Sequence, residues 1–320
     1  MPRNAIAALL AAVLLAAGPA AAQAPKTVRI IVAFAPGGPV DFVARVLADQ
    51  LGKELGQTVI VEDKPGANGA IGADLVAKAA PDGATLWLTS VGAIAINPSL
   101  YPNLQYDPQR DFAPVEGVVN NVEVLVVNPR NPANNAAEFV AATKLKSEPT
   151  PMASSGIGSI PHLAMELMAD ASGAKLLHVP YKGAAPAITD VLGGQVAGFF
   201  GDVPGLMGHI KGGKLKAIGI AAPKRHPLLP EVKTFEELGI HGVDSDNWYA
   251  LFTAAKTPRA EIERLNHAVR RALANDTVRN KLVASGADPA PSSPEELAAL
   301  LARDTAKWSR VIREKQIKAE

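Results

Sequence analysis

Two glycine-rich turns, far apart in the chain, contain the residues whose chemistry is best suited to binding a ligand. Each turn lies next to an apolar, strand-like run and leads into a helical pattern. Glycine lets a ligand approach the backbone closely, and the N–H groups at a helix N-terminus attract an anion. We therefore expect an anionic, carboxylated ligand to be held between two lobes. The expected contacts are Ala35, Pro36, Gly37, Gly38 and Asp41 from the first turn, and Ser154, Ser155, Gly156, Gly158, Ser159 and His162 from the second.

Further segments follow predicted strands and should border the same crevice. Ligands of open parallel sheets bind outside the carboxyl ends of the strands. No P-loop is present, and the glycines of 66–72 do not have dinucleotide-binding spacing, so nucleotide binding is not expected. These strand ends contribute Ser90, Gly92 and Ala93 after the third apolar run, Tyr181 as a cleft wall, and Asp202 after a later strand.

Several of these residues have alternative roles. Asp41 can cap the amides of the first helical turn or orient a bound water. Ser154 or Ser155 is the candidate nucleophile of a secreted hydrolase, but the Gly-x-Ser-x-Gly elbow is absent and no base with an orienting acid stands out. His162 and Glu166 have the spacing of two metal ligands, without a third ligand or a His-Glu-x-x-His motif. We expect a capping or surface role for His162, no catalytic residue, no metal and no cofactor.

The elements that must position these residues alternate between strands and helices. Apolar runs at 28–34, 58–62 and 85–89 are separated by helical patterns, which predicts a parallel-sheet unit. The run at 122–127 is a predicted crossing to a second lobe, where the alternation restarts, and 248–252 is the predicted return. Helices that begin near Pro258 and Ser293 should pack back on the first lobe. The predicted lobes are 25–124 with 250–320, and 125–249.

The N-terminus and the composition indicate an exported protein. Arg3 precedes an apolar stretch and small residues suited to cleavage, so 1–22 is a predicted signal peptide, too short to span a bilayer. The chain has no cysteine and therefore neither a disulfide nor a lipid anchor on an N-terminal cysteine. Its net charge is +1 with both signs interspersed, which argues against nucleic acid as a partner.

Several motifs, taken in order, resemble one family: the periplasmic substrate-binding proteins of tripartite tricarboxylate transporters, often called the Bug family. The resemblance covers nearly the whole predicted mature chain. The motifs are Phe-Ala-Pro-Gly-Gly at 34–38 with Asp41, Val-Glu-Asp-Lys-Pro-Gly-Ala at 61–67, Ala-Ala-Pro-Asp-Gly at 79–83, Ala-Ile-Asn-Pro-Ser-Leu-Tyr at 95–101, Tyr-Asp-Pro at 106–108, Asp-Phe-Ala-Pro-Val at 111–115, Ala-Ser-Ser-Gly at 153–156, His-Val-Pro-Tyr-Lys-Gly at 178–183 and Asp-Val-Leu-Gly-Gly-Gln-Val at 190–196.

The resemblance implies an α/β, two-lobed periplasmic-binding-protein (Venus flytrap) fold, type II-like, with mainly parallel sheets flanked by helices. It implies a monomeric, periplasmic, non-enzymatic receptor that captures a small di- or tricarboxylate or related organic acid in the cleft. The first turn, the Ser90 loop and the Ser154–Ser159 turn would hold the carboxylates, partly through ordered water. The membrane permease subunits of such a transporter are the implied partner. The alternatives are the serine-dependent hydrolase and a sensor that signals to a membrane kinase.

Two departures from the family pattern bear on the ligand. Pro39 and Val40 stand where relatives often have serine or threonine, which removes a hydroxyl and an amide donor. The strand that commonly ends in Phe-Asp here ends in Phe200-Gly201, with Asp202 one residue later. In amino-acid-binding relatives that aspartate pairs with the ligand's ammonium group. Gly201 therefore favours a carboxylate without an amine, unless Asp202 substitutes.

Overall fold

Apolar runs buried in the protein form the centre of the first of two β-sheets. The computed structural model describes residues 27–318, in which β1 (Val28–Val32) lies between β2 (Val59–Asp63) and β3 (Thr85–Ser90). Both pairs are parallel, as the strand–helix–strand pattern predicts. Antiparallel pairs extend the sheet beyond β3 through β10 (Asn247–Ala254), β4 (Phe112–Asn121) and β11 (Asp288–Pro289).

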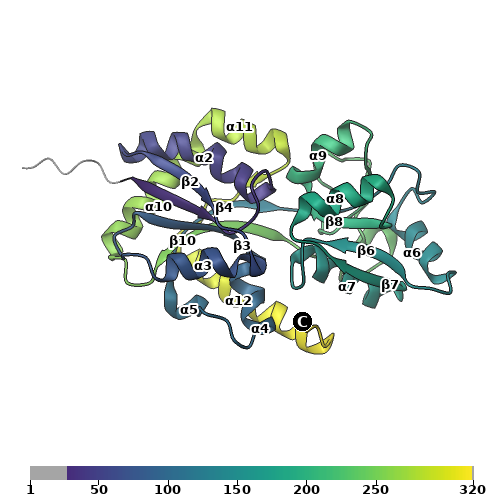
Figure 1. Cartoon of the computed structure of the whole chain (residues 1–320). Helices are drawn as coiled ribbons and strands as arrows, with labels where there is room; N and C mark the ends of the chain where they lie inside the picture. Colours follow the sequence, from purple (N-terminus) through teal and green to yellow (C-terminus); the bar gives the residue numbers. More distant parts are fainter. Residues whose placement is uncertain (1–26, 319–320) are drawn as a thin grey trace, which may run out of the picture.

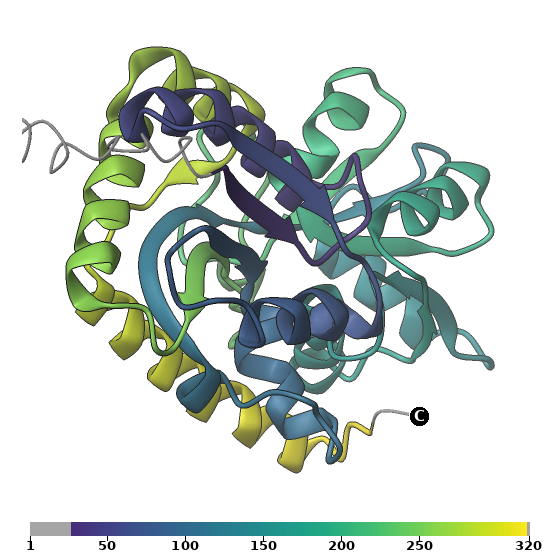
Figure 2. The ribbon, with the colours of Figure 1, turned by 60° about the vertical axis from the view of Figure 1, so that its left-hand side comes forward.

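Helices cover both faces of this sheet and complete the first lobe, which we define as this sheet with its helices. On one face α2 (Pro39–Leu55) packs with α10 (Arg259–Ala274) and α11 (Asp276–Ser285). On the other lie α3 (Ala70–Ala77) and α12 (Pro294–Glu314). Figure 2 shows the three C-terminal helices along the outer edge of this lobe, and the packing predicted for the helices that begin near Pro258 and Ser293 is confirmed. The short elements are η1 (Ala67–Gly69), η2 (Gly92–Ile96), α4 (Asn97–Leu100) and α5 (Pro108–Asp111).

The second lobe is built on the other sheet, in which the strand order is β7-β6-β8-β5-β9. It lies beside the first lobe (Figure 1). α6 and α7 pack on one face of this sheet, and α8 and α9 pack on the other. The strands are β5 (Glu123–Val127), β6 (Thr150–Ser154), β7 (Leu176–Pro180), β8 (Gly198–Asp202) and β9 (Lys216–Ile220). The helices are α6 (Ala136–Lys144), α7 (Ile160–Ser172), α8 (Ala184–Gly193), α9 (Val203–Lys211) and the single turn η3 (Glu236–Leu238).

Both sheets are mixed, because the strands next to the crossings run against their neighbours. β6 pairs in parallel with β7 and β8, whereas β5 is antiparallel to β8 and β9. The two-lobed α/β fold is therefore as predicted, with fewer parallel pairs than the expected mainly parallel sheets. β4, α9 and α11 are elements that the sequence patterns did not predict. Only Val122 separates β4 of the first sheet from β5 of the second.

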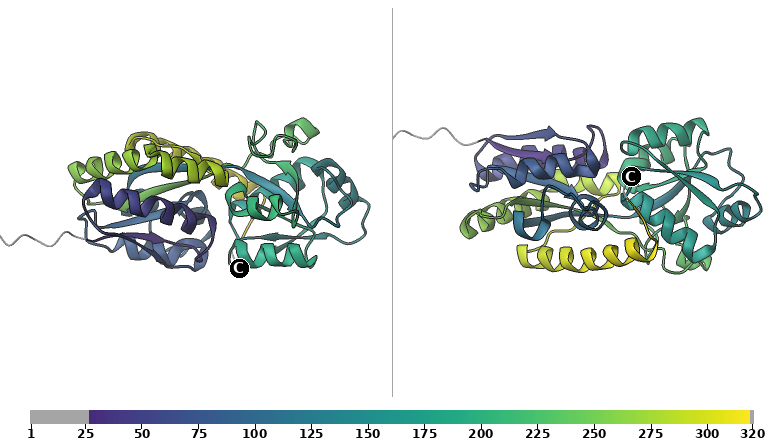
Figure 3. Two further views of the ribbon diagram at one scale, coloured as in Figure 1. Left: turned by 90° about the horizontal axis from the view of Figure 1, so that it is seen from above. Right: turned by 60° about the horizontal axis from the view of Figure 1, so that its bottom comes forward.

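The two lobes contact each other directly as well as through the crossing strands. The His226 Nε2 atom lies 3.2 Å from the carbonyl oxygen of Gly286. α12 runs from beneath the first lobe toward the second (Figure 3), where Lys315 forms an ion pair with Asp170 of α7. The boundaries 25–124 with 250–320, and 125–249, stay a prediction of how the lobes divide. The predicted signal peptide, 1–22, lies outside the described residues. None of the helices within 27–318 has the length and hydrophobicity that crossing a bilayer requires.

A capping box at the start of α12 gives a test of the fold. The Ser293 hydroxyl accepts from the Glu296 N–H at 3.1 Å, and the Glu296 carboxylate accepts from the Ser293 N–H at 2.7 Å. Replacing Ser293 with alanine should lower the free energy of unfolding by about 1 kcal/mol in urea denaturation. Ser309→Ala, within the same helix, removes a hydroxyl that caps nothing and should cause no such loss. Equal effects of the two changes would contradict the capping role.

Candidate functional site

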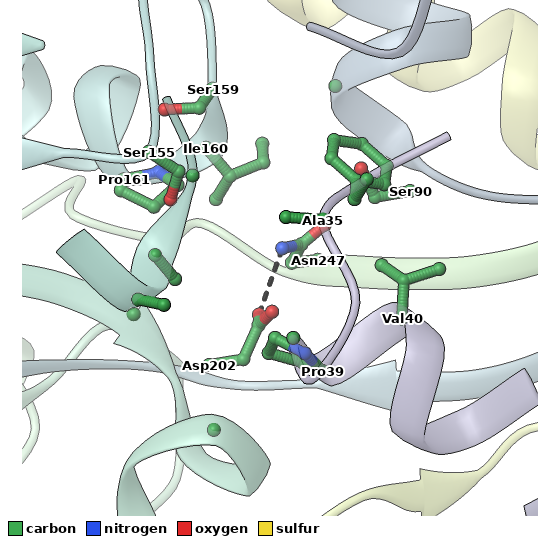
Figure 4. A pocket seen from close by; sticks show the side chains of 18 of the residues that line it. Ala35, Pro39, Val40, Ser90, Ser155, Ser159, Ile160, Pro161, Asp202 and Asn247 are labelled. Atoms are coloured by element: carbon green, nitrogen blue, oxygen red, sulfur yellow. Dashed lines mark hydrogen bonds between the residues drawn. The ribbon is translucent and has the colours of Figure 1, made fainter. Parts of the chain in front are cut away.

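The starts of four helices meet around one pocket between the lobes. The pocket has a volume of about 100 Å³. Figure 4 shows Ser155, Ser159 and Ile160 of the second lobe on one side and Val40 of the first lobe on the other, with Asp202 between them. The helix-start residues that line it are Gly38, Pro39 and Val40 (α2), Ser159, Ile160 and Pro161 (α7), Gly183, Ala184, Ala185 and Pro186 (α8), and Asp202, Gly205 and Leu206 (α9).

Local sequence explains why each helix begins at the pocket. Each has a proline within its first three residues, Pro39, Pro161, Pro186 and Pro204, where the missing N–H removes no helical hydrogen bond. The first N–H groups of a helix have no acceptor within it. The amides left in this way include Val40 in α2, Ile160 in α7, and Ala184 and Ala185 in α8.

The electrostatics of the pocket come from these helix starts. Among the described residues that line it there is no lysine, arginine or histidine, and Asp202 is the one acid. Each helix N-terminus carries the equivalent of about half a positive charge. Four such ends aimed at one volume favour an anion, and the arrangement needs no cationic side chain. Ser90 and Ser155 add hydroxyl groups from the two lobes, and Asn68 adds an amide.

The first turn serves the pocket differently from the prediction. Ala35, Pro36 and Gly38 line it, but Gly37 and Asp41 do not. The Gly37 N–H donates to the Asp41 carboxylate at 2.8 Å, and the Gly38 N–H donates to the Ala35 carbonyl at 3.3 Å. These two glycine amides are therefore used within the turn. The donors available to a ligand are the helix amides that follow them. Asp41, which also pairs with Arg45 at 2.7 Å, caps the turn as one of its two expected roles.

The residues predicted in the second turn also separate into those that line the pocket and those that do not. Ser155 and Ser159 line the pocket, whereas Ser154, Gly156, Gly158 and His162 do not. The Gly156 N–H donates to the Ser154 hydroxyl oxygen, and the Gly158 N–H donates to His162 Nδ1, both at 3.1 Å. His162 thus has the expected capping role. It is 5% exposed, however, so the alternative surface position is wrong.

A stacked histidine pair lies behind this turn. The rings of His162 and His178 are parallel, with centroids 3.7 Å apart, and His178 Nε2 lies 2.6 Å from the Ser154 hydroxyl oxygen. Burial and the neighbouring His162 lower the pKa of His178 to about 4. Ser154 is fully buried and does not line the pocket, so this serine–histidine contact supports the turn and reaches no substrate. Within 27–318, no three histidine or acidic side chains are grouped as metal ligands.

The predicted loop residues also separate into two groups. Ser90, Gly92 and Asp202 line the pocket, and Ala93 and Tyr181 do not. The Ala93 carbonyl accepts from the Tyr106 hydroxyl, which ties η2 to the first lobe. The Tyr181 hydroxyl donates to Asp190 of α8, so its ring tip faces that helix. The ligand contacts proposed for all the predicted residues stay predictions.

Sequence reasoning missed a part of the lining from both lobes. It did not identify 183–186, although a glycine followed by a first-turn proline is the same signal that marks Gly38 and Pro39. It also missed Asn68, Asn247 and Tyr249, which no local motif distinguishes.

Asn247 and Tyr249 form a buried polar cluster with two acids at the inner side of the pocket. Asn247 Nδ2 donates to Asp202 Oδ1 at 2.9 Å and to Glu123 Oε1 at 3.3 Å. The Tyr249 hydroxyl donates to Asp202 Oδ2. Glu123 and Asp202 belong to the second sheet, and Asn247 and Tyr249 to β10 of the first. The cluster therefore joins the lobes at the base of the pocket.

Comparison with known proteins agrees with this geometry. The family model described as the tripartite tricarboxylate transporter family receptor matches residues 43–317. The chain belongs to this family. Protein BugT of Bordetella pertussis, a relative of this receptor, is 36% identical over 290 residues, which cover 90% of this chain and 89% of BugT. The family predicted from the motifs is confirmed, and the receptor is a periplasmic-type binding protein and not an enzyme.

Two solved structures from Rhodopseudomonas palustris are similar to the receptor along most of its length. MatC (Rpa3494) with bound malate has a TM-score of 0.84 at 34% identity and covers 89% of this chain and 98% of that one. Rpa4515 with adipate has a TM-score of 0.88 at 29% identity and covers 92% of this chain and 99% of that one. The two-lobed binding-protein fold is thereby confirmed.

Proposed function

We propose that this receptor captures a small carboxylate in the pocket between its lobes and delivers it to the permease of a tripartite transporter. The observation that carries the proposal is the convergence of four helix N-termini on a pocket with no basic side chain in its described lining. The proposal includes export to the periplasm after removal of 1–22. The malate and adipate bound by MatC and Rpa4515 support the ligand class.

The physical basis of capture is the replacement of lost hydration. A carboxylate that leaves water needs new hydrogen bonds. A helix N-terminus contributes about 0.3–1 kcal/mol, and up to about 2 kcal/mol when it is partly buried. Helix starts from both lobes, such as Val40 and Ile160, would contact one ligand only when the lobes are close. Ligand binding therefore favours the closed arrangement by its difference in affinity for the two states.

We expect a carboxylate to compact and stabilise the receptor. The protein is first stripped of carried-over ligand by unfolding and refolding, and then mixed with mono-, di- and tricarboxylates. A ligand at a hundred times its Kd adds about 2.7 kcal/mol, which should raise Tm by about 5 °C or more. The radius of gyration from small-angle scattering should fall with the same ligand. The corresponding methyl esters are the matched control. A panel in which no acid changes either quantity would refute the proposal.

Uptake in the native cell distinguishes transport from sensing. Deletion of a transport receptor abolishes uptake of its ligand even when the permease is expressed from a constitutive promoter. Deletion of a sensor abolishes only the induction of uptake, so constitutive expression of the permease restores it.

A further inference from the structure

The floor of the pocket holds a carboxylate with unused capacity to accept hydrogen bonds. Asp202 lines the pocket and is 9% exposed. A carboxylate has about four lone-pair positions. Asn247 occupies one on Oδ1, the Tyr249 hydroxyl occupies one on Oδ2, and the hydrogen bond with Glu123 occupies a third. One position therefore remains on an acid that is withdrawn from solvent and faces the ligand volume (Figure 4). A buried acceptor is costly unless a donor meets it.

The neighbouring acid determines which of the two carboxyl groups is charged. Glu123 is fully buried, and burial together with the adjacent Asp202 raises its pKa well above the ordinary value. Burial also raises the pKa of Asp202, but hydrogen bonds with Tyr249, Glu123 and Asn247 oppose that shift. Two adjacent buried acids share one proton. The shared proton is therefore favoured on Glu123 and the negative charge on Asp202.

We propose that Asp202 makes this receptor selective for carboxylates that also carry a hydrogen-bond donor, a hydroxyl or an ammonium group. The inference rests on the proposed function, because it assumes that the carboxylate of the ligand lies at the helix starts. The donor group then meets the free lone pair of Asp202. A second carboxylate at that place would face the charge of Asp202 without a lysine or arginine among the described lining residues to offset it.

The apolar part of the lining agrees with a ligand of low charge. Besides the helix starts, the walls include Phe34, Ile188 and Phe199. These side chains favour a short hydrocarbon segment between the carboxylate and the donor group. The ligand class is therefore a small hydroxy- or amino-carboxylate with a single net negative charge or none, and not a plain di- or tricarboxylate.

A matched ligand series tests the selectivity of the natural chain. The refolded receptor is titrated calorimetrically with butanoate, 4-hydroxybutanoate, 4-aminobutanoate and succinate, and with propanoate, lactate, alanine and malonate. In at least one series, the hydroxy or amino acid should bind ten times or more tightly than both the unsubstituted acid and the diacid. The hydroxy and amino arms show which donor Asp202 prefers.

The variant Asp202→Asn assigns the selectivity to this side chain. It keeps the shape and removes the charge, so the preference for the donor-bearing acid over the diacid should fall by tenfold or more. Asp190→Asn is the matched control, because it removes a charge from α8 of the same lobe at a residue outside the pocket lining. That control should keep the wild-type preference. The Tm of each variant without ligand shows whether it has folded.

The outcomes separate this inference from the proposed function. If no acid in either series binds but another acid of the wider carboxylate panel does, the selectivity is overturned, and if no acid of that panel binds, the proposed function itself fails. If butanoate, propanoate or the diacids bind at least as tightly as the donor-bearing acids, the selectivity is overturned while the carboxylate receptor stands. A folded Asp202→Asn variant that retains the full preference overturns the role of Asp202. If that variant does not fold, the wild-type series still decides the selectivity.

Discussion

Replacing Gly158 with alanine is expected to weaken binding of the receptor's carboxylate ligand by about 30- to 300-fold, with both lobes still folded. Gly158 lies in the second-lobe turn and faces Leu100 of α4 in the first lobe. A Cβ atom at this position would lie 1.9 Å from Leu100 Cδ1. Leu100 is 5% exposed and packs in the core of the first lobe, so it cannot move aside freely. The clash arises only when the lobes are together, which is the arrangement that ligand binding favours.

Two comparisons isolate the contact between the lobes. Gly158 has a φ of +74°, so alanine also adds backbone strain of about 1–2 kcal/mol. Gly213→Ala in the second lobe has the same kind of strain, with a φ of +64° and nothing within 4 Å of the added Cβ, and should leave the Kd unchanged. Leu100→Ala removes the obstacle. In a double-mutant cycle it should restore most of the affinity that Gly158→Ala loses relative to the Leu100→Ala background.

The measurements are the Kd for the most stabilising carboxylate and the radius of gyration with that ligand present. The variant should remain more extended than wild type at equal saturation. A Gly158→Ala receptor that binds within about threefold of wild type and compacts normally would show that Gly158 and Leu100 do not meet in the ligand-bound state.

Most of the fold was predictable because its local signals agree with its tertiary structure. The apolar runs at 28–34 and 85–89 became central strands, and the serine–proline–glutamate start at 293–296 became a capped helix. β4 was missed because buried Glu116 and the asparagines at its end interrupt the apolar pattern of a strand. Glu116 is satisfied by Asn266 and Ser292, which come from segments far away in the chain.

The candidate site was predictable only to the level of the turns. Gly38 and Ser155 line the pocket, and glycine and serine before a helix are local signals of an N-terminus. Which amides stay free depends on side-chain bonds, such as the one from Gly37 to Asp41, that residue spacing does not determine. Asn247 meets Asp202 and Glu123 across 45 and 124 residues. The crossing strands bring Asn247, Asp202 and Glu123 together in the fold, so no local sequence motif identifies them as a cluster.

The pH dependence of stability should change in opposite directions when Glu116 and His178 are replaced. Glu116 is fully buried in β4, where it accepts from Asn266 Nδ2 at 2.7 Å and from the Ser292 N–H. Burial raises its pKa from 4.5 to about 7. In this range the native state holds a proton that the unfolded state releases. Glu116 therefore reduces stability as the pH rises from about 4.5 to about 7.

His178 has the reverse effect, because its pKa falls from 6.5 to about 4. As the pH drops from about 6.5 to about 4, His178 binds a proton in the unfolded chain but not in the native protein. His178 therefore increases stability as the pH rises. Each shift corresponds to about 3 kcal/mol over its full range, since one pKa unit is about 1.4 kcal/mol. Between about pH 4.5 and 6.5 the two contributions largely cancel in the natural chain.

The variants Glu116→Gln and His178→Gln should uncover the two contributions in urea denaturation at about pH 4.5, 5.5 and 6.5. Relative to wild type, Glu116→Gln should gain about 2–3 kcal/mol of stability between the lowest and highest pH, and His178→Gln should lose about as much. The slope is decisive, because glutamine at 116 also places an amide against Asn266 and lowers stability at every pH. The double variant should regain the shallow dependence of wild type, since the groups lie in different lobes and their effects should add. Parallel curves for all four proteins would mean that neither side chain has the shifted pKa that its surroundings impose.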